Sequence, residues 1–220
     1  MHGPDLEGEL REGIRLEQAL RWEDAERLYR RALETPSDAR SAATADLRLR
    51  HANALLQLQR LDEARNAFDE ALTAAIANGE PPVLARALLG AGVFAASRGD
   101  LRRGEDFLLA ALDRFHEVHD REGLQGEGWA LLNLAAIYGK SKRLDLAFLT
   151  FDKARERLFA VENWVGVATA WELQAELRGK LGDADRAAQD FHEAMSFYGK
   201  QGMEEKVAAL REKLGGRRVV

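Results

Sequence analysis

Two histidines and two acidic residues lie together in the stretch HEVHD, residues 116–120. His116 and His119 are three residues apart, so on a helix they can point in the same direction. Carboxylates such as those of Glu117 and Asp120 are common further ligands for zinc or iron. A metal held here would favour an enzyme. Whether it is held depends on the elements that position these residues, and the rest of the chain predicts those elements.

Composition narrows the possible classes of protein. The chain has 220 residues, enough for a sizeable core or an elongated array, and it has no cysteine, which excludes disulfides, thiolate metal sites and cysteine nucleophiles. The formal net charge is -5 with both signs interspersed, which argues against nucleic acid as a partner. No stretch approaches the ~18 consecutive apolar residues of a membrane span. We therefore expect a cytoplasmic protein whose partner is neither nucleic acid nor a membrane.

Helix-forming residues dominate and only four prolines interrupt the chain, so the predicted fold class is all-α. A repeated pattern then divides the chain. Five segments align without gaps, and each has a small residue, a large apolar residue four positions later and an alanine three positions after that. The spacing keeps all three on one helical face. The small residues are Ala25, Ala64, Gly104, Ala147 and Ala187, the large ones Tyr29, Phe68, Leu108, Phe151 and Phe191, and the alanines Ala32, Ala71, Ala111, Ala154 and Ala194.

Another small residue precedes each of these segments, twelve positions before the first small residue. Small side chains on two antiparallel helices let the helices approach closely. Short turns such as SRGD (97–100) and KLGD (180–183) separate the two helices, with a glycine to end one and an aspartate to cap the next. Each unit is therefore predicted to be a helical hairpin. The preceding small residues are Gly13, Ala52, Gly92, Ala135 and Ala175.

This pattern resembles that of the tetratricopeptide repeat family, which has Gly or Ala in the first helix and Ala, an aromatic residue and Ala in the second. The units recur about every 40 residues, longer than the family's common period of about 34. The resemblance implies a right-handed α-solenoid, or superhelix, with one array over residues 1–220. The expected repeats are 5–34, 38–77, 82–117, 121–160 and 164–198, followed by a capping helix at 203–214 and a loose tail at 215–220.

The repeat alignment gives HEVHD an ordinary structural role. His116 falls in the last turn of a helix and His119 in the turn before the next hairpin, where other units have glycine or glutamate. Polar and cationic residues suit the C-terminus of a helix, and Asp120 suits the cap of the next one. We therefore expect no metal site, no cofactor and no catalytic residue, and the chain also lacks the common phosphate-loop and nucleophile motifs. A metal at HEVHD is the alternative.

The connection after the third hairpin carries three extra residues and holds Gly123, Gly126 and Gly128. Glycine disfavours helix, so we expect the next helix to begin only at about residue 125. Residues 119–128 would then form a glycine-rich loop. A tolerated surface insertion and a loop that contacts a partner are both open.

In arrays of the resembled family the first helices of the hairpins line a concave groove, which suits extended peptides or partner helices. Arginine forks onto carboxylates and asparagine holds a peptide main chain, so a partner with acidic and apolar residues is expected. The alternative is that acidic residues on the same face neutralise the arginines in solvated ion pairs. These acidic residues are Glu7, Asp46, Glu172 and Glu176. The predicted groove residues are Arg50, Asn53, Arg86, Trp129, Asn133 and Lys140.

Together these features favour a non-enzymatic scaffold or adaptor that binds a protein or peptide in the concave groove. The alternative function is a regulatory sensor or receptor whose array changes curvature when it binds a small ligand or peptide. A homo-oligomer that forms through the ends of the array is expected if Val207, Leu210 and Leu214 are not covered within one chain.

Overall fold

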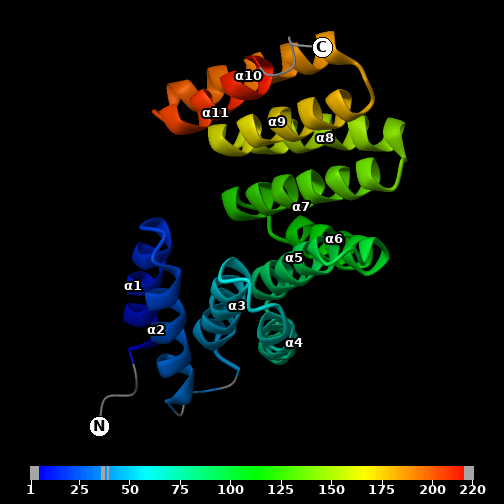
Figure 1. The fold of residues 1–220 in the computed structure, drawn as a ribbon. Helices are drawn as coiled ribbons and strands as arrows, with labels where there is room; N and C mark the ends of the chain where they lie inside the picture. Colours follow the sequence, from blue (N-terminus) through cyan, green and yellow to red (C-terminus); the bar gives the residue numbers. More distant parts are fainter. Residues whose placement is uncertain (1–4, 36–37, 39, 216–220) are drawn as a thin grey trace. The chain divides into compact units, whose positions relative to one another are not determined.

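The computed structural model describes residues 5–35, 38 and 40–215, and all regular secondary structure in these residues is helical. The helices fall into two compact units, unit 1 (residues 1–118) and unit 2 (residues 119–220) (Figure 1). Unit 1 contains α1 (Leu6–Gln18), α2 (Trp22–Glu34), α3 (Ala42–Gln57), α4 (Leu61–Asn78), α5 (Pro81–Ser97) and α6 (Leu101–His116). Unit 2 contains α7 (Arg121–Lys140), α8 (Leu144–Ala160), α9 (Trp164–Lys180), α10 (Ala184–Lys200) and α11 (Glu204–Gly215).

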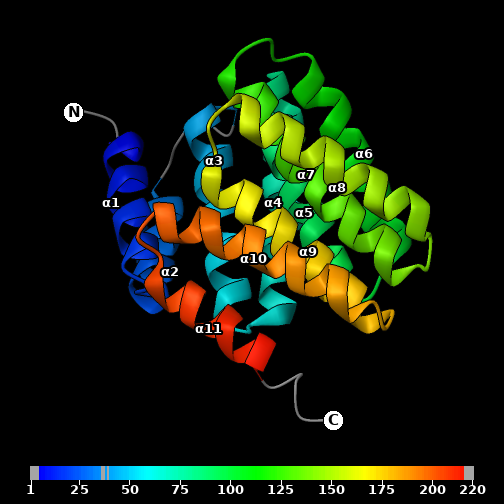
Figure 2. The same ribbon diagram turned by 90° about the horizontal axis from the view of Figure 1, so that it is seen from above.

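Consecutive helices pair as hairpins within each unit. The pairs are α1 with α2, α3 with α4 and α5 with α6 in unit 1, and α7 with α8 and α9 with α10 in unit 2, where α11 packs on α10 (Figures 1 and 2). The all-α fold class and the organisation into five hairpins with a closing helix are confirmed. The single array over residues 1–220 stays a prediction, as do its repeat boundaries.

The repeated residues form the contacts between the two helices of each hairpin. The large residue of every segment is almost completely buried, as in Tyr29 and Phe151. The small residues are needed for close approach, because a Cβ added to Gly13 would lie 2.1 Å from Cε1 of Tyr29. In the third hairpin, a Cβ on Gly92 would lie 3.2 Å from the backbone oxygen of Gly104. Burial of large side chains beside small ones therefore holds each hairpin together.

The turns within the hairpins share one backbone conformation. Gly99 and Gly182 have φ angles of 86° and 82°, in the left-handed region that favours glycine. Leu20, Gln59 and Lys142 occupy the same place in other hairpins with φ between 57° and 60°. The predicted caps are confirmed, since Asp100 and Asp183 accept hydrogen bonds from the backbone N–H groups of Arg103 and Arg186.

The predicted glycine-rich loop at 119–128 is wrong. Helix α7 begins at Arg121, four residues earlier than expected, and the Asp120 side chain caps it by accepting from the Gly123 N–H. Gly123, Gly126 and Gly128 therefore lie inside the helix and are buried. A Cβ on Gly128 would lie 2.6 Å from Cγ of Leu158 on α8. At Gly128, glycine thus serves close helix packing, and neither the surface insertion nor the partner-contacting loop applies there.

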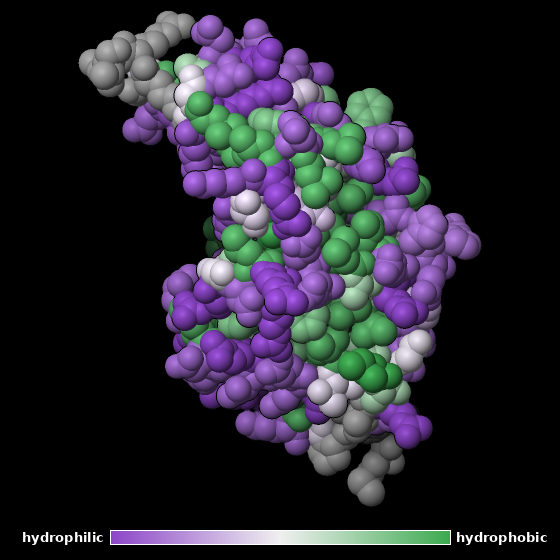
Figure 3. Space-filling view, turned by 90° about the vertical axis from the view of Figure 1, so that its right-hand side faces the viewer, coloured by the Kyte–Doolittle hydropathy of each residue, from purple (hydrophilic) through white to green (hydrophobic). Residues whose placement is uncertain are grey.

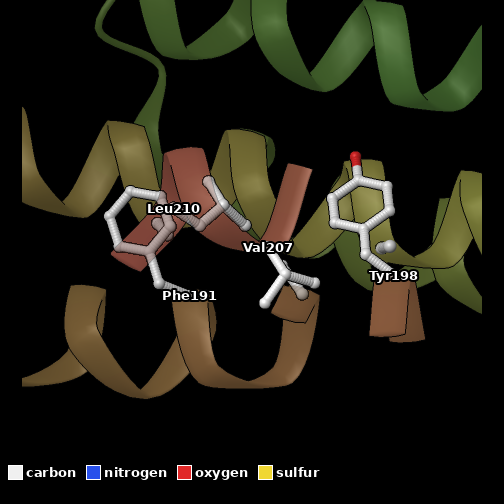
Figure 4. Packing of buried hydrophobic residues seen from close by; sticks show 7 residues of the cluster. Phe191, Tyr198, Val207 and Leu210 are labelled. Carbon is white, nitrogen blue, oxygen red and sulfur yellow. The ribbon is translucent and has the colours of Figure 1, made fainter. Parts of the chain in front are cut away.

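Helix α11 closes unit 2 by packing on α10. Val207 is 4% exposed and Leu210 is 1% exposed, and both join a cluster with Phe191 and Tyr198 (Figure 4). Leu214 is half-buried against the same cluster. The apolar stripe that would favour self-association is thus largely covered within the chain. Of the predicted tail, Gly215 ends α11, and residues 216–220 lie outside the described part of the chain.

Candidate functional site

The residues of HEVHD do not converge on a metal position. His116 is the last residue of α6 and is exposed, as is His119 in the connection to α7. Glu117 pairs with Arg114 at 2.6 Å, and Asp120 caps α7. Across the described residues, no group of three or more His, Cys, Asp or Glu side chains is placed to hold a metal ion. Nor is any helix among them both long and apolar enough to cross a membrane.

Three of the predicted groove residues lie on the first helices of unit 1. Arg50 and Asn53 are on α3, and Arg86 is on α5. Asp46, Arg50 and Asn53 follow one another at spacings of four and three residues, so they lie along one face of α3. The side chains of Asp46, Arg50, Asn53 and Arg86 are all half-buried. The face they form is therefore polar and only partly open to water.

Arg86 forms a two-pronged ion pair with Asp46 across α5 and α3. Its Nε and Nη2 both donate to Oδ1, at 3.1 and 3.0 Å, and Nη2 also donates to Oδ2 at 3.0 Å. Such paired hydrogen bonds fix the guanidinium in one plane. The alternative that Asp46 neutralises an arginine on this face is thus confirmed for Arg86.

Arg50 pairs with a residue that the sequence interpretation missed, Glu17 of α1. Arg50 Nη1 donates to Glu17 Oε2 at 2.7 Å, and the Tyr29 hydroxyl donates to Glu17 Oε1 at 2.8 Å. Burial raises the pKa of Tyr29, and the hydrogen bond to Glu17 raises it further. The available signal was that Glu17 stands one turn after Gly13, on the side of α1 that meets Tyr29. We call Glu17–Arg50 and Asp46–Arg86 the first-helix ion pairs.

The other three predicted residues lie on α7 in unit 2. Asn133 Nδ2 donates to the Trp129 backbone oxygen at 2.8 Å, so this amide group partly serves its own helix. Lys140 is exposed at the end of α7 and lines a small cavity of about 150 Å³ with Gly139 and Leu177. Trp129, Asn133 and Lys140 are spaced by four and seven residues and share one face of α7.

Two of the acidic residues expected to neutralise the groove arginines have other partners. Glu172 and Glu176 of α9 pair with Lys213 of α11, at 3.4 and 2.6 Å. Glu172 also accepts from the Tyr198 hydroxyl at 2.9 Å. The structure thus brings Arg50, Asn53 and Arg86 together in unit 1, and Trp129, Asn133 and Lys140 together in unit 2. One track through all six stays a prediction.

The comparisons with known proteins concern the fold. Residues 45–75, within α3 and α4, match the sequence model of the tetratricopeptide repeat. No curated protein matches the sequence. A kinesin light chain protein of Podosopora anserina with nearly identical TPR-like repeats superposes with a TM-score of 0.68, at 11% identity, over 92% of this chain and 99% of that one.

Two further solved structures are similar in fold. A Rap protein complexed with Competence and Sporulation Factor has a TM-score of 0.54 at 16% identity, covering 93% of this chain and 72% of that one. YrrB, described as a TPR protein with an unusual peptide-binding site, has a TM-score of 0.51 at 16% identity, covering 95% and 93%. Residues 45–75 thus match one tetratricopeptide repeat, and the helical hairpins of the chain have a fold similar to that of solved tetratricopeptide repeat structures.

Proposed function

We propose that this protein is a non-enzymatic scaffold that binds a protein or peptide partner along its first helices. The observation that carries the proposal is the row of half-buried, oriented charges on α3 and α5, where Arg50 and Arg86 are held by the first-helix ion pairs. The similar structures add support, because one is a Rap protein complexed with Competence and Sporulation Factor and another is described as having an unusual peptide-binding site. The tetratricopeptide fold suits such a task, since a stack of hairpins presents a preformed surface.

Arg50 and Asn53 provide the chemistry for an acidic, extended partner. The ion pair of Arg50 with Glu17 is made through Nη1, and a guanidinium carries five N–H donors, so one side chain can hold Glu17 and a partner carboxylate together. Arg50 is 34% exposed, which leaves a path for the partner. Asn53 makes no side-chain hydrogen bond within the described residues, and its amide can both donate to and accept from a peptide main chain.

The face of α7 extends the same chemistry in unit 2. Lys140 adds an exposed cation, Trp129 a half-buried aromatic surface, and Asn133 an acceptor oxygen beside its bonded nitrogen. A partner segment that alternates acidic and apolar residues would suit both faces. We assign all six residues to partner binding: Arg50, Asn53, Arg86, Trp129, Asn133 and Lys140.

The first-helix ion pairs also favour a second candidate, a sensor whose shape responds to its ligand. Glu17–Arg50 joins α1 to α3, and Asp46–Arg86 joins α3 to α5. A ligand carboxylate that displaces Glu17 from Arg50 would loosen one of these connections and change the spacing of the helices. A sensor should change its small-angle scattering profile on binding, whereas a plain scaffold should keep it.

The test begins with a partner isolated on the full chain and identified, followed by titration calorimetry. We expect Arg50→Ala with Arg86→Ala to weaken binding by at least about 2 kcal/mol, because both substitutions remove the guanidinium groups that would pair with partner carboxylates. The matched control is Glu17→Gln with Asp46→Asn, which breaks the same ion pairs but keeps both arginines, and should bind at least as tightly as the parent. Arg102→Ala, an exposed change on α6, should have no effect. Equal affinity of the double alanine variant and the parent would refute the proposed face.

A further inference from the structure

A cavity of about 130 Å³ lies in unit 1, where α5 packs against both α4 and α6 (Figure 1). Three phenylalanines line it. Phe68 of α4 and Phe94 of α5 are buried, with ring centroids 5.1 Å apart, and Phe107 of α6 is half-buried. An apolar cavity of about 150 Å³ holds one benzene molecule in another protein, so this cavity has room for a single ring.

The cavity is open because α5 has two alanines, Ala91 and Ala95, where the other first helices have larger side chains. Ala91 stands one residue before the small residue of α5, and Ala95 stands three residues after it. Both line the cavity. At the corresponding positions, the other first helices have Glu12, His51, Leu134 and Gln174, and Leu16, Leu55, Tyr138 and Arg178. The space is thus a departure of one hairpin from the repeat pattern.

Unit 2 shows what fills the same place when these side chains are long. Gln174 Nε2 and Arg178 Nη1 of α9 both donate to Asp190 of α10, at 3.0 Å. Asp190 is 3% exposed and corresponds to Phe107, since each lies three residues after the small residue of its second helix. In unit 2 the chain's own side chains therefore fill the place that unit 1 leaves open.

Three arginines from three different elements also line the cavity. Arg65 is on α4, Arg98 follows α5, and Arg103 is in the first turn of α6. The Arg103 guanidinium lies 5.3 Å from the Phe107 ring centroid, and its Nη2 lies 3.7 Å from Oδ1 of Asp69. The side chains of Arg65 and Arg98 are exposed and make no hydrogen bond or ion pair with other described residues. Two cations at this aromatic cavity are therefore available to a ligand.

Two carboxylates limit the charge that the cavity accepts. Asp69 pairs with Arg103, and Asp100 caps α6 by accepting from the Arg103 N–H at 3.1 Å. With three arginines and two aspartates, the lining has a formal charge of 3 − 2 = +1. One negative charge balances it, whereas the second charge of a phosphate group would be repelled by the aspartates. The cavity thus favours a carboxylate, which guanidinium groups bind through paired hydrogen bonds.

We propose that this cavity binds a small aromatic monocarboxylate such as benzoate. The ring contacts Phe68, Phe94 and Phe107, and the carboxylate pairs with Arg65 and Arg98. Aromatic side chains favour a bound ring through edge and face contacts, and a guanidinium can also stack on it. The site shares no residue with the first-helix faces and does not depend on the function proposed for them.

The test is a titration of the full chain with 4-fluorobenzoate, followed by fluorine NMR. We expect saturable binding with a dissociation constant of about 1 mM or lower. Arg65→Gln with Arg98→Gln should weaken binding by at least about 10-fold, because the two cations that meet the carboxylate are removed. Arg102→Gln with Arg114→Gln removes the same charge from exposed positions of α6 outside the cavity and should leave the affinity unchanged.

A second variant tests the cavity itself. Ala95→Leu gives α5 the residue that α3 has at the corresponding position, so it should fill the space for the ring and abolish binding while the helical circular dichroism signal is kept. If this variant is unfolded, the smaller change Ala95→Val should weaken binding.

Several results would overturn the proposal. These are no saturable binding to the parent, equal affinity of the parent and the Arg65→Gln, Arg98→Gln variant, or full affinity in a folded Ala95 variant. Competition by inorganic phosphate as strong as that by benzoate would show a general anion-binding patch instead. Equal competition by cyclohexanecarboxylate would exclude the preference for an aromatic ring, and equal binding of 4-fluorobenzamide would exclude the role of the carboxylate.

Discussion

Phe151 illustrates how one residue of the repeat pattern stabilises its hairpin. Its ring is 1% exposed in unit 2. Truncation to alanine leaves a cavity beside helices that cannot fully collapse, so Phe151→Ala should reduce the free energy of unfolding by about 3–5 kcal/mol. The measurement is urea denaturation followed by circular dichroism. Leu149→Ala, on the same helix but largely exposed, should reduce the free energy of unfolding far less. Similar losses for the two variants would contradict the assigned face.

Tyr198 should make the protein sensitive to alkali. Burial, with the charge and hydrogen bond of Glu172, raises its pKa from 10.0 to about 12. Because the folded-state pKa lies above the unfolded value, this contribution to stability is fully present below pH 10. It is lost as the pH rises from about 10 to about 12, since only the unfolded tyrosine ionises readily.

The check compares melting temperatures of the parent and Tyr198→Phe across this pH range. Phenylalanine cannot ionise, so the variant should lose less stability between pH 10 and pH 12 than the parent does. It should also be less stable than the parent at pH 8, because the hydrogen bond to Glu172 is gone. Identical slopes in the two proteins would show that Tyr198 is not responsible.

The sequence predicts individual residues best where their role is local. Asp120 as a helix cap follows from residue type and position. The pairing of Asp46 with an arginine follows from the repeat alignment, which places both on the groove side of the first helices. Glu17 was missed because the alignment did not assign it to that side, although it pairs with Arg50 there. The side chain that an ion pair selects depends on how neighbouring helices rotate against each other. That rotation is a tertiary property, so local spacing does not reveal it.

At the scale of elements, the hairpin turns offer a matched pair of substitutions. Lys142 and Gly182 occupy the same left-handed turn position in successive hairpins, with φ of 60° and 82°. A side chain there strains the backbone, so Gly182→Ala should destabilise the protein by about 1 kcal/mol and Lys142→Gly should stabilise it by up to about 1 kcal/mol. A Cβ on Gly182 would meet no atom within 4 Å, so backbone strain alone determines the change in stability. Thermal melts that shift in the same direction for both would contradict this reasoning.

Helix positions follow from the repeat pattern, but the start of α7 does not. The segments of small, large and alanine residues correspond to α2, α4, α6, α8 and α10, because burial of these residues determines where the chain is helical. The expected start of α7 at about residue 125 rests on the low helix propensity of glycine alone. Their burial, and the approach of Leu158 to Gly128, shows that tertiary packing overrides that propensity.

At the scale of the whole molecule, the division into two units predicts separable folding. Unit 1 and unit 2 each have their own buried clusters, one around Tyr29 and another around Phe191. We expect fragments 1–118 and 119–220 to be helical and to melt cooperatively when made separately. Circular dichroism of the two fragments is the measurement. A fragment without helical signal would show that its unit needs the other.

The first-helix ion pairs give unit 1 a mechanical property. Both pairs are partly open to water, so added salt weakens them, while the apolar contacts within the hairpins persist. The resistance of α1, α3 and α5 to relative movement therefore depends on ionic strength. The force needed to deform unit 1 should fall as ionic strength rises. A partner carboxylate that competes for the same arginines should lower this force in the same way.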